Sequence, residues 1–445
     1  MRKGILFFFG VLILPLIVQA QDVQQITLQE AIDIALENNY QLEQARNNLD
    51  LAESFVLNEK LDYAPSISGS IGASSSSGGN FIPGTDTFVS RNIKSFNASL
   101  RASIPLFQGF ANINSLRSAQ FDKKSQKENV EWVRESIIFQ TASTYLQLLL
   151  NKELLEIARE NLAASQQQLE QVEVQVKVGA RPTVDLYNQQ ATLANNELEV
   201  TNRENALQMS RLQLISIMQV DPRKEYEFAT PEISDEEIEI QRYELPTLVN
   251  TALENRSDLE RERLNIESLE YQLKTIKGSL YPSLSLSASI LSRYNYPNDV
   301  SFNDQFFLEN VNRSIGLSLS IPIFNGFDRR LNIQAQKINY KNAKLALENT
   351  RLQVIQDVNQ AYSDYQSILK QIEAAEKALQ AAERSYITQK QRYEVGAGTL
   401  IELSEANAQY VQAQADYTSA RYNYIFQQKI LEYFIGKLGQ DVQLQ

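Results

Sequence analysis

The chain contains neither cysteine nor histidine among its 445 residues, and only three methionines. These absences remove the thiol nucleophile, the commonest general base and the usual ligands of a zinc site. The sequence also lacks a Gly-x-Ser-x-Gly nucleophile motif and a phosphate-binding glycine loop. The composition therefore argues against an enzyme, and we expect no catalytic residue, no metal site and no cofactor.

Long apolar runs are absent apart from one near the N-terminus. Residues 1–20 have the form of a secretory signal peptide, with Arg2 and Lys3, an apolar stretch from Ile5 to Ile17, and a small-residue cleavage site ending at Ala20. The apolar stretch is shorter than the roughly 20 residues that a membrane-spanning helix requires. We therefore expect the chain itself to be exported from the cytoplasm and its signal peptide to be removed. In an oxidising compartment a chain without disulfides is stabilised by burial of apolar surface.

Basic residues are scarce relative to acidic ones, with 42 Lys and Arg against 54 Asp and Glu and a net charge of −12. An acidic surface repels the phosphates of nucleic acids and of anionic membranes. We expect no nucleic-acid partner.

Glycine and proline are missing from two long runs, residues 110–178 and 327–395. Both runs are rich in good helix formers, so each predicts a helix of about 100 Å at 1.5 Å per residue. Turns at 179–182 and 396–399 should lead into second helices at about 183–220 and 400–435. Narrow apolar stripes suit packing against neighbouring helices, as in coiled coils.

The prolines, glycines and short motifs that mark turns repeat without a gap after 217 residues. For two pairs of prolines, 282 − 65 and 322 − 105 both give 217. The motif at residues 104–110, Ile-Pro-Leu-Phe-Gln-Gly-Phe, returns at 321–327 as Ile-Pro-Ile-Phe-Asn-Gly-Phe. This duplication predicts a first repeat at 21–220, a linker at 221–243, a second repeat at 244–437 and a short tail at 438–445.

Each repeat also contains two segments with a period of two, at about 65–74 and 95–106, and at 282–292 and 313–323. Such alternation predicts strands with one apolar face and one serine-rich face, and Arg101 falls on the serine face. The segments between them, 74–94 and 293–312, have the composition of exposed loops. The aromatic residues of 293–312 either form a belt at a membrane rim or pack the loop on itself.

Four such strands form either a small soluble sheet or part of a membrane barrel. The helices are too long and too polar to cover a soluble sheet, and four strands cannot close a barrel. Three copies of four strands give twelve. The predicted fold is therefore mainly α with a membrane β-barrel: two gapless repeats of helix–strand–strand–long helix–helix, whose trimer forms a 12-stranded β-barrel and a long α-helical tunnel.

The mature chain resembles the TolC-type outer-membrane efflux protein family. The resemblance is carried by the duplicated strand-to-helix motif, by the turn at residues 392–396 and by residues 420–424, Ala-Arg-Tyr-Asn-Tyr. It implies a homotrimer in outer-membrane lipid, with the helical tunnel in the periplasm. It also implies a periplasmic adaptor and an inner-membrane transporter as partners. The chain would be a passive exit duct for efflux or export. Type I protein secretion, metal efflux and, in another class, a structural trimeric helical surface protein remain alternatives.

Two glycines end the long helices, and the resemblance assigns the turns around them to adaptor docking. Gly179 and Gly396 suit the left-handed conformation that terminates helices, which is by itself a sufficient role for them. The resemblance implies two docking tips, Val178, Gly179 and Ala180 in the first repeat, and Val395, Gly396 and Ala397 in the second.

The resemblance also assigns a periplasmic aperture, consisting of Asp185, Glu402, Glu405, Tyr393 and Arg181. In a trimer the carboxylates would form rings that attract cations. The family's best-studied members have an arginine at the position of Gly398, and Arg181 holds the equivalent position of the first repeat, because 398 − 217 = 181. Local roles compete with this assignment, since Thr399 and Glu402 have capping-box spacing and Asp185 lies in the first turn of a helix.

Overall fold

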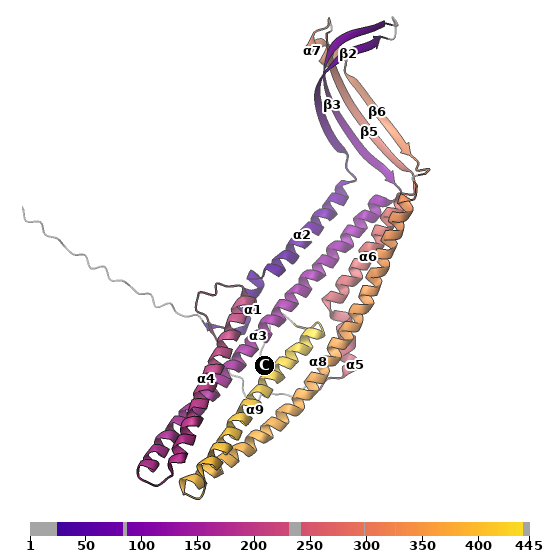
Figure 1. Cartoon of the computed structure of the whole chain (residues 1–445). Coiled ribbons are helices and arrows are strands. Elements are labelled where there is room, and N and C mark those ends of the chain that lie inside the picture. Colours follow the sequence, from indigo (N-terminus) through magenta and orange to yellow (C-terminus); the bar gives the residue numbers. More distant parts are fainter. Residues whose placement is uncertain (1–24, 83–86, 231–241, 298, 325, 439–445) are drawn as a thin grey trace, which may run out of the picture.

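The computed structural model describes residues 25–82, 87–230, 242–297, 299–324 and 326–438. Within them the chain is a long rod, with a β-sheet at one end and two helical hairpin tips at the other (Figure 1). The predicted signal peptide, residues 231–241 of the predicted linker and nearly all of the tail lie outside the described residues. None of the described helices is long and apolar enough to span a membrane.

Among the described residues, each repeat contributes two long strands and four helices that have a counterpart in the other repeat. The first repeat consists of α1 (Leu28–Asn38), α2 (Tyr40–Leu61), β2 (Ser66–Ile82), β3 (Thr87–Gln108), α3 (Ala111–Lys177) and α4 (Thr183–Met218). The second consists of α5 (Leu245–Asn255), α6 (Ser257–Gly278), β5 (Ser283–Tyr296), β6 (Asn312–Ser320), α8 (Asp328–Glu394) and α9 (Leu400–Phe434). Since 245 − 28 and 328 − 111 both give 217, the mainly helical two-repeat fold is confirmed.

The single helix that the predicted repeat order places before the first strand is two helices, α1 and α2. The break falls at Asn39, whose side chain accepts hydrogen bonds from the backbone N–H groups of Gln41 and Leu42 and so starts α2. Asparagine is a strong N-cap because its carbonyl oxygen replaces the missing helical acceptor.

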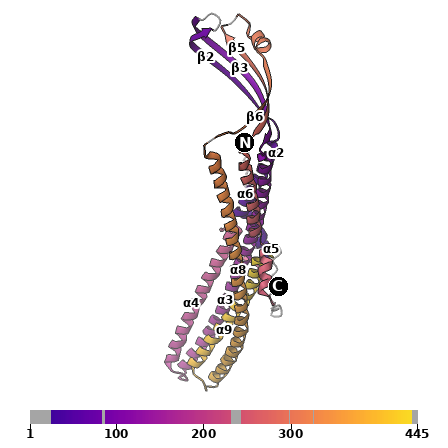
Figure 2. The ribbon, with the colours of Figure 1, turned by 90° about the vertical axis from the view of Figure 1, so that its right-hand side faces the viewer.

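Short helices continue one another end to end. The amide of Asn38 donates to the Met218 carbonyl at the end of α4 over 3.4 Å, and the Tyr40 N–H donates to Gln219 Oε1 over 3.2 Å. In the second repeat, Gly436, just after α9, packs against the backbone of Asn255 and Arg256. The pairs α4–α2 and α9–α6 therefore run beside the uninterrupted α3 and α8 (Figures 1 and 2).

The main core lies at mid-length, where these helix ends meet. It contains aromatic and aliphatic side chains from both repeats, among them Ile32, Ile138, Tyr145, Leu214 and Tyr365. The Tyr145 hydroxyl lies 2.9 Å from the Ile26 carbonyl and 2.7 Å from that of Ala229. It thereby ties α3 to the short parallel pair β1 (Gln25–Ile26) and β4 (Glu227–Phe228), and burial raises its pKa well above the ordinary value.

The four long strands form one antiparallel sheet in the order β2-β3-β5-β6. β2 and β3 pair from Ser66 with Ser103 as far as Ile82 with Thr87, so most of the predicted loop at 74–94 is strand. Its Ser and Gly residues lack the apolar alternation by which the other strands were predicted. β6 ends at Ser320, short of the predicted 323, and Pro322 just beyond it has no N–H to pair.

The aromatic residues between β5 and β6 pack on the sheet and on one another. This segment contains α7 (Phe302–Asp304) and η2 (Gln305–Glu309). Phe302 stacks on Phe306 with 5.2 Å between ring centroids, and Phe96 of β3 lies 5.3 Å from Phe306. Of the two alternatives for these residues, packing of the loop on itself is confirmed.

A close backbone contact joins the sheet to the helices at the duplicated motif. Gly109 has φ +60°, and a Cβ there would lie 2.3 Å from the Gly278 carbonyl. Only glycine satisfies both conditions. The equivalent Gly326 has φ +66° but nothing within 4 Å of its Cβ position.

Candidate functional site: the hairpin tips

The two hairpin turns have the same geometry. Gly179 has φ +76° and Gly396 has φ +75°. In the first turn the Ala180 N–H donates to the Gln175 carbonyl over 2.8 Å, and in the second the Ala397 N–H donates to the Arg392 carbonyl over 2.8 Å. These six-to-one hydrogen bonds are the mark of a Schellman motif, so both turns are rigid helix ends.

Both turns carry an exposed valine. Val178 is 71% exposed and Val395 is 79% exposed, which makes them among the most exposed apolar side chains of the helical region. A Cβ added at Gly179 or Gly396 would meet nothing within 4 Å. The tip residues therefore form two apolar projections at the end of the rod, which lie side by side (Figures 1 and 2).

Tyr393 joins the two hairpins just above the tips. It is 4% exposed and packs in a small cluster with Val172, Leu400 and Leu403. Its hydroxyl donates to Gln175 Oε1 over 3.3 Å, and the Arg181 guanidinium lies 4.3 Å from its ring centroid. Of the predicted aperture residues, Tyr393 and Arg181 are therefore in direct contact across the hairpins.

The electrostatics of Tyr393 involve Asp185 as well. Burial raises the pKa of the Tyr393 hydroxyl, Asp185 adds to that rise, and Arg181 opposes it. Asp185 lies in the first turn of α4, after the N-cap Pro182, which has no side-chain cap. The structure thus brings Asp185, Arg181 and Tyr393 together at one junction.

Glu402 and Glu405 have different surroundings from Asp185. The Glu402 carboxylate accepts the Thr399 N–H over 2.9 Å, and the Glu402 N–H donates to Thr399 Oγ1 over 3.2 Å. This is a complete capping box, and the hydrogen bond from the Thr399 backbone lowers the pKa of Glu402. Glu405 is exposed one turn further along α9. Glu402 therefore has the local role that its spacing from Thr399 predicted, namely the capping box at the start of α9.

Gly398 occupies a position with little room for a side chain. Its N–H donates to the Arg392 carbonyl over 3.0 Å, and a Cβ there would lie 3.3 Å from the Arg392 Cβ and from the Tyr393 nitrogen. An arginine at 398 would require this turn to shift. In this chain the guanidinium over Tyr393 comes instead from Arg181 of the other hairpin.

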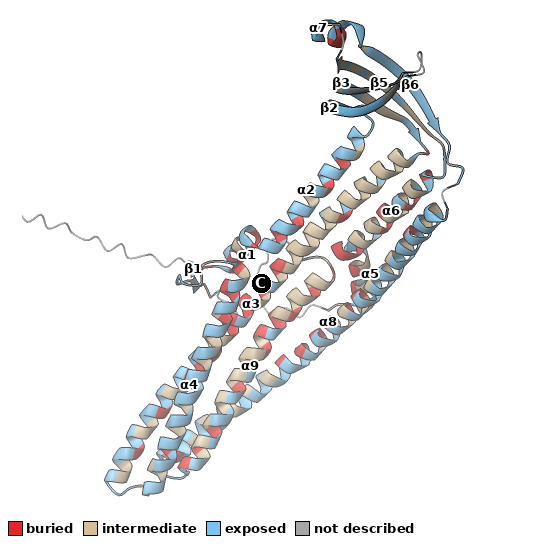
Figure 3. Cartoon of the chain, turned by 45° about the horizontal axis from the view of Figure 1, so that its top comes forward, coloured by how far each residue is buried: buried red, intermediate tan, exposed pale blue. Residues whose placement is uncertain are grey.

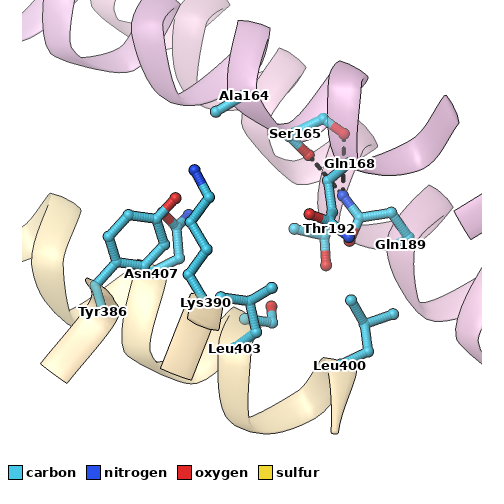
Figure 4. A pocket seen from close by; sticks show the side chains of 11 residues that line it. Ala164, Ser165, Gln168, Gln189, Thr192, Tyr386, Lys390, Leu400, Leu403 and Asn407 are labelled. Atoms are coloured by element: carbon cyan, nitrogen blue, oxygen red, sulfur yellow. Dashed lines mark hydrogen bonds between the residues drawn. The ribbon is translucent and has the colours of Figure 1, made fainter. Parts of the chain in front are cut away.

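A row of polar residues, here called the polar seam, lies between the two hairpins next to the Tyr393 junction, on the side toward the sheet. The sequence did not reveal it. The polar seam encloses a cavity of about 50 Å³ lined by residues of α3, α4, α8 and α9, including Gln168, Gln189, Lys390 and Asn407 (Figure 4). Gln189 is 4% exposed, and its amide donates to the Ser165 carbonyl and hydroxyl, each over 3.1 Å. The sequence signal that could have located this seam is the presence of Gln and Asn at helix positions that packing buries.

The seam also contains a chain of amide hydrogen bonds. Asn407 of α9 donates to Asn161 of α3 over 2.9 Å, and Asn161 donates to Asn196 of α4 over 3.1 Å. Water can replace such hydrogen bonds at small net cost, unlike buried apolar contacts. Along this seam the two hairpins are therefore joined by polar contacts that water can replace, in addition to the apolar cluster around Tyr393.

An open four-stranded sheet joined to two long helical hairpins is the architecture of a channel-tunnel protein. The family model described as "Outer membrane efflux protein" matches residues 31–218 and again residues 248–437. The chain belongs to this family. It is therefore a passive outer-membrane efflux channel protein and not an enzyme, with its helical part in the periplasm.

Individual relatives are distant in sequence. The outer membrane protein TolC of Salmonella enteritidis is 24% identical over 76% of this chain and 69% of that protein. The efflux protein BepC of Brucella suis is 21% identical over 70% of this chain and 63% of that protein. The fold matches solved structures closely. CusC gives a TM-score of 0.80 at 20% identity, covering 92% of both chains, and Campylobacter jejuni CmeC gives 0.79 at 19% identity, covering 94% and 87%.

Proposed function

We propose that three copies of this chain form a closed exit duct, in which a twelve-stranded barrel crosses the outer membrane and the helices form a periplasmic tunnel. The observation that carries this proposal is the strand order. Within one chain, β3 of the first repeat pairs with β5 of the second, which leaves β2 and β6 as free edges. The repeat makes β6 the counterpart of β3 and β2 the counterpart of β5, so β6 of one copy pairs with β2 of the next.

The helices support the same closure. α3 packs against α6 of the other repeat, whereas α8, its counterpart, is exposed over much of its length (Figure 3). At the sheet junction, Gly109 meets Gly278 of the second repeat, whereas its counterpart Gly326 has open space beside it. Ile323 and Phe324 are 94% and 88% exposed in the single chain. Each of these surfaces lacks the contact that a neighbouring copy would supply.

The tips are the proposed attachment point for a periplasmic adaptor, which would connect the duct to an inner-membrane transporter. Val178 and Val395 offer apolar contacts on rigid turns, at the end of the rod furthest from the sheet. The transported substrate would be chosen by the transporter. Among the described residues, no group of three or more His, Cys, Asp or Glu side chains could hold a metal ion.

The junction of Arg181, Asp185 and Tyr393 is the proposed latch of the periplasmic aperture, and Glu402 and Glu405 are its proposed selectivity groups. The latch is a buried tyrosine held by one hydrogen bond and one cation–π contact, which together amount to about 1–3 kcal/mol. Such a latch holds the hairpins together while remaining within reach of an adaptor's binding energy.

Assembly is the decisive test. Protein purified from outer membranes in detergent should have the mass of three chains by light scattering and should conduct ions in planar bilayers. A monodisperse monomer that remains soluble without detergent would refute the proposed duct.

A further inference from the structure

The four long strands contain five basic residues, Arg91, Lys94, Arg101, Arg293 and Arg313, and no aspartate or glutamate in their sequences. The chain as a whole is acidic, with a net charge of −12. The charge of the sheet is therefore opposite in sign to that of the rest of the molecule, and the position of each basic residue on the sheet decides what that charge does.

Arg101 lies on the serine face. It pairs with Ser68 of β2 on one side and with Ser289 of β5 on the other, and Ser289 pairs in turn with Ser314 of β6. The Ser289 and Ser314 hydroxyls are 2.8 Å apart, which confirms that their side chains share this face. Arg101 is thus the one charged side chain in a row of serines that crosses the sheet.

Arg293 lies on the same face, four residues along β5 from Ser289, or about 13 Å at 3.3 Å per residue. It pairs with Asn97 of β3, which pairs with Gly72 of β2. The ion pairs of the described residues include neither Arg101 nor Arg293. The acids that follow Arg293 most closely along the chain, Asp299, Asp304 and Glu309, belong to the segment between β5 and β6.

Lys94 and Arg313 lie on the opposite, apolar face. Arg313 pairs with Ile290, and Ile290 pairs with Leu100, which alternates with Arg101 along β3. Arg313 is the second residue of β6, where a long side chain can extend toward the membrane surface. These two residues carry the same charge as Arg101 but cannot reach the interior of a barrel.

We propose that Arg101 and Arg293 form two cationic levels inside the barrel, which favour solutes bearing carboxylate or phosphate groups. This inference rests on the proposed trimer, in which the apolar face contacts lipid and the serine face lines the lumen. Three copies place three arginines at each level. Because charges act over about 10 Å at 0.1 M salt, such rings influence the lumen of a barrel of this size.

The barrel and the periplasmic mouth would then have opposite charge. Asp185, Glu402 and Glu405 lie at the far end of the rod from the strands. A cationic lumen holds an oxyanion by charge-assisted hydrogen bonds of guanidinium groups, which match carboxylate and phosphate geometry. The barrel would therefore pass anionic or zwitterionic organic solutes more readily than cationic ones.

The test is ion selectivity of the trimer in planar bilayers, measured as the reversal potential in a KCl gradient. Arg101→Gln should lower the ratio of chloride to potassium permeability by about twofold or more, and the double variant with Arg293→Gln should lower it further. Ser68→Glu, which places a carboxylate beside Arg101, should act in the same direction. Pyrophosphate should block the wild type more strongly than the double variant.

Arg313→Gln is the matched control, because it removes the same charge from the lipid-facing side. Its selectivity should equal that of the wild type. Unchanged selectivity in both Arg101→Gln and Ser68→Glu trimers that still conduct would overturn the inference, as would an equal change in Arg313→Gln. A wild-type protein that forms no trimer and no channel would instead refute the proposed duct.

Discussion

Asn39 and Arg256 occupy the same position in the two repeats, immediately before α2 and α6. Asn39 caps its helix through its side chain, whereas Arg256 has no capping hydrogen bond. Arg256 instead forms a bidentate pair with Asp258, at 2.7 Å and 3.0 Å, and lies 3.6 Å from Asp357 of α8. Its guanidinium also lies 5.9 Å from the Phe434 ring at the end of α9. One residue thus joins α6, α8 and α9.

Loss of Arg256 should destabilise this joint strongly. The Arg256 and Asp258 side chains are only 12% and 11% exposed, so Arg256→Met would leave a buried carboxylate unpaired and should cost about 3–5 kcal/mol. Urea unfolding followed by helical circular dichroism measures this change. Arg263→Met is the control, because its pair with Glu260 is exposed and should contribute at most about 1 kcal/mol. Equal losses in the two variants would contradict the role assigned to Arg256.

The start of α9 combines a helix cap with the proposed selectivity function, and three variants separate them. Glu402→Gln keeps a side-chain acceptor for the Thr399 N–H but removes the charge, so it should weaken cation preference at the periplasmic mouth without fraying the helix. Glu402→Ala should do both. Glu405→Ala should affect selectivity alone, because Glu405 takes no part in the capping box.

The pH dependence of this cap has a definite sign. Since the folded pKa of Glu402 lies below its ordinary value of 4.5, the stabilisation by its carboxylate is present above that value and is lost as the pH falls through the lowered folded pKa. Hydrogen exchange of the first turn of α9 measures the fraying. Identical exchange in Glu402→Ala and the wild type would show that the capping box is not significant.

The hairpin turns allow backbone shape to be separated from side-chain bulk. Gly396 has φ +75° with open space around it, so a substitution there is resisted by backbone conformation and not by a clash. Gly396→Asn should preserve the turn, because asparagine tolerates the left-handed region, whereas Gly396→Val should deform it. If an adaptor recognises this turn, export should survive the first variant and fail in the second, with trimers present in both. Equal export in the two variants would exclude docking at this turn.

The elements that the sequence predicted are those with a local signal. Runs free of glycine and proline located α3 and α8, and alternation located the lipid-facing parts of β2, β3, β5 and β6. The outer part of β2 was missed because its serine and glycine residues have no apolar face to alternate, and the outer part of β3 was missed because its mixed polar, basic and apolar residues do not alternate regularly. The contact of Arg181 with Tyr393 was not predictable, because it joins residues from different hairpins that come together only through packing. Predictions for the signal peptide and tail remain predictions.

At the scale of the whole molecule, a single chain leaves the apolar face of its sheet uncovered. Apolar side chains on the lipid-facing side of the sheet, such as Ile71 and Ile315, are 77% and 82% exposed. A soluble protein rarely leaves such a continuous apolar face uncovered. The opposite face carries serines whose hydroxyls are paired across strands, for example Ser70 with Ser99 at 2.8 Å. The two faces therefore require different solvents.

Adjacent residues of β5 test that difference directly. Leu286 lies on the apolar face and Ser287 lies on the serine face, and both lie in the part of β5 that pairs with β3 and with β6. Leu286→Arg would place a charge against lipid at a cost of up to about 2–4 kcal/mol per copy, and a trimer incurs this cost three times. Ser287→Arg adds the same side chain to a water-filled lumen, where it remains hydrated.

We therefore expect Leu286→Arg to reduce the amount of trimer in the outer membrane severely, and Ser287→Arg to assemble normally. Membrane fractionation followed by electrophoresis of unheated samples measures both. The Ser287→Arg channel should also become more permeable to chloride, because its three new charges lie inside the barrel. Assembly of both variants at equal levels would mean that the two faces are not divided between lipid and water. The reverse ranking, with Ser287→Arg failing alone, would place the serine face against the membrane and invert the barrel.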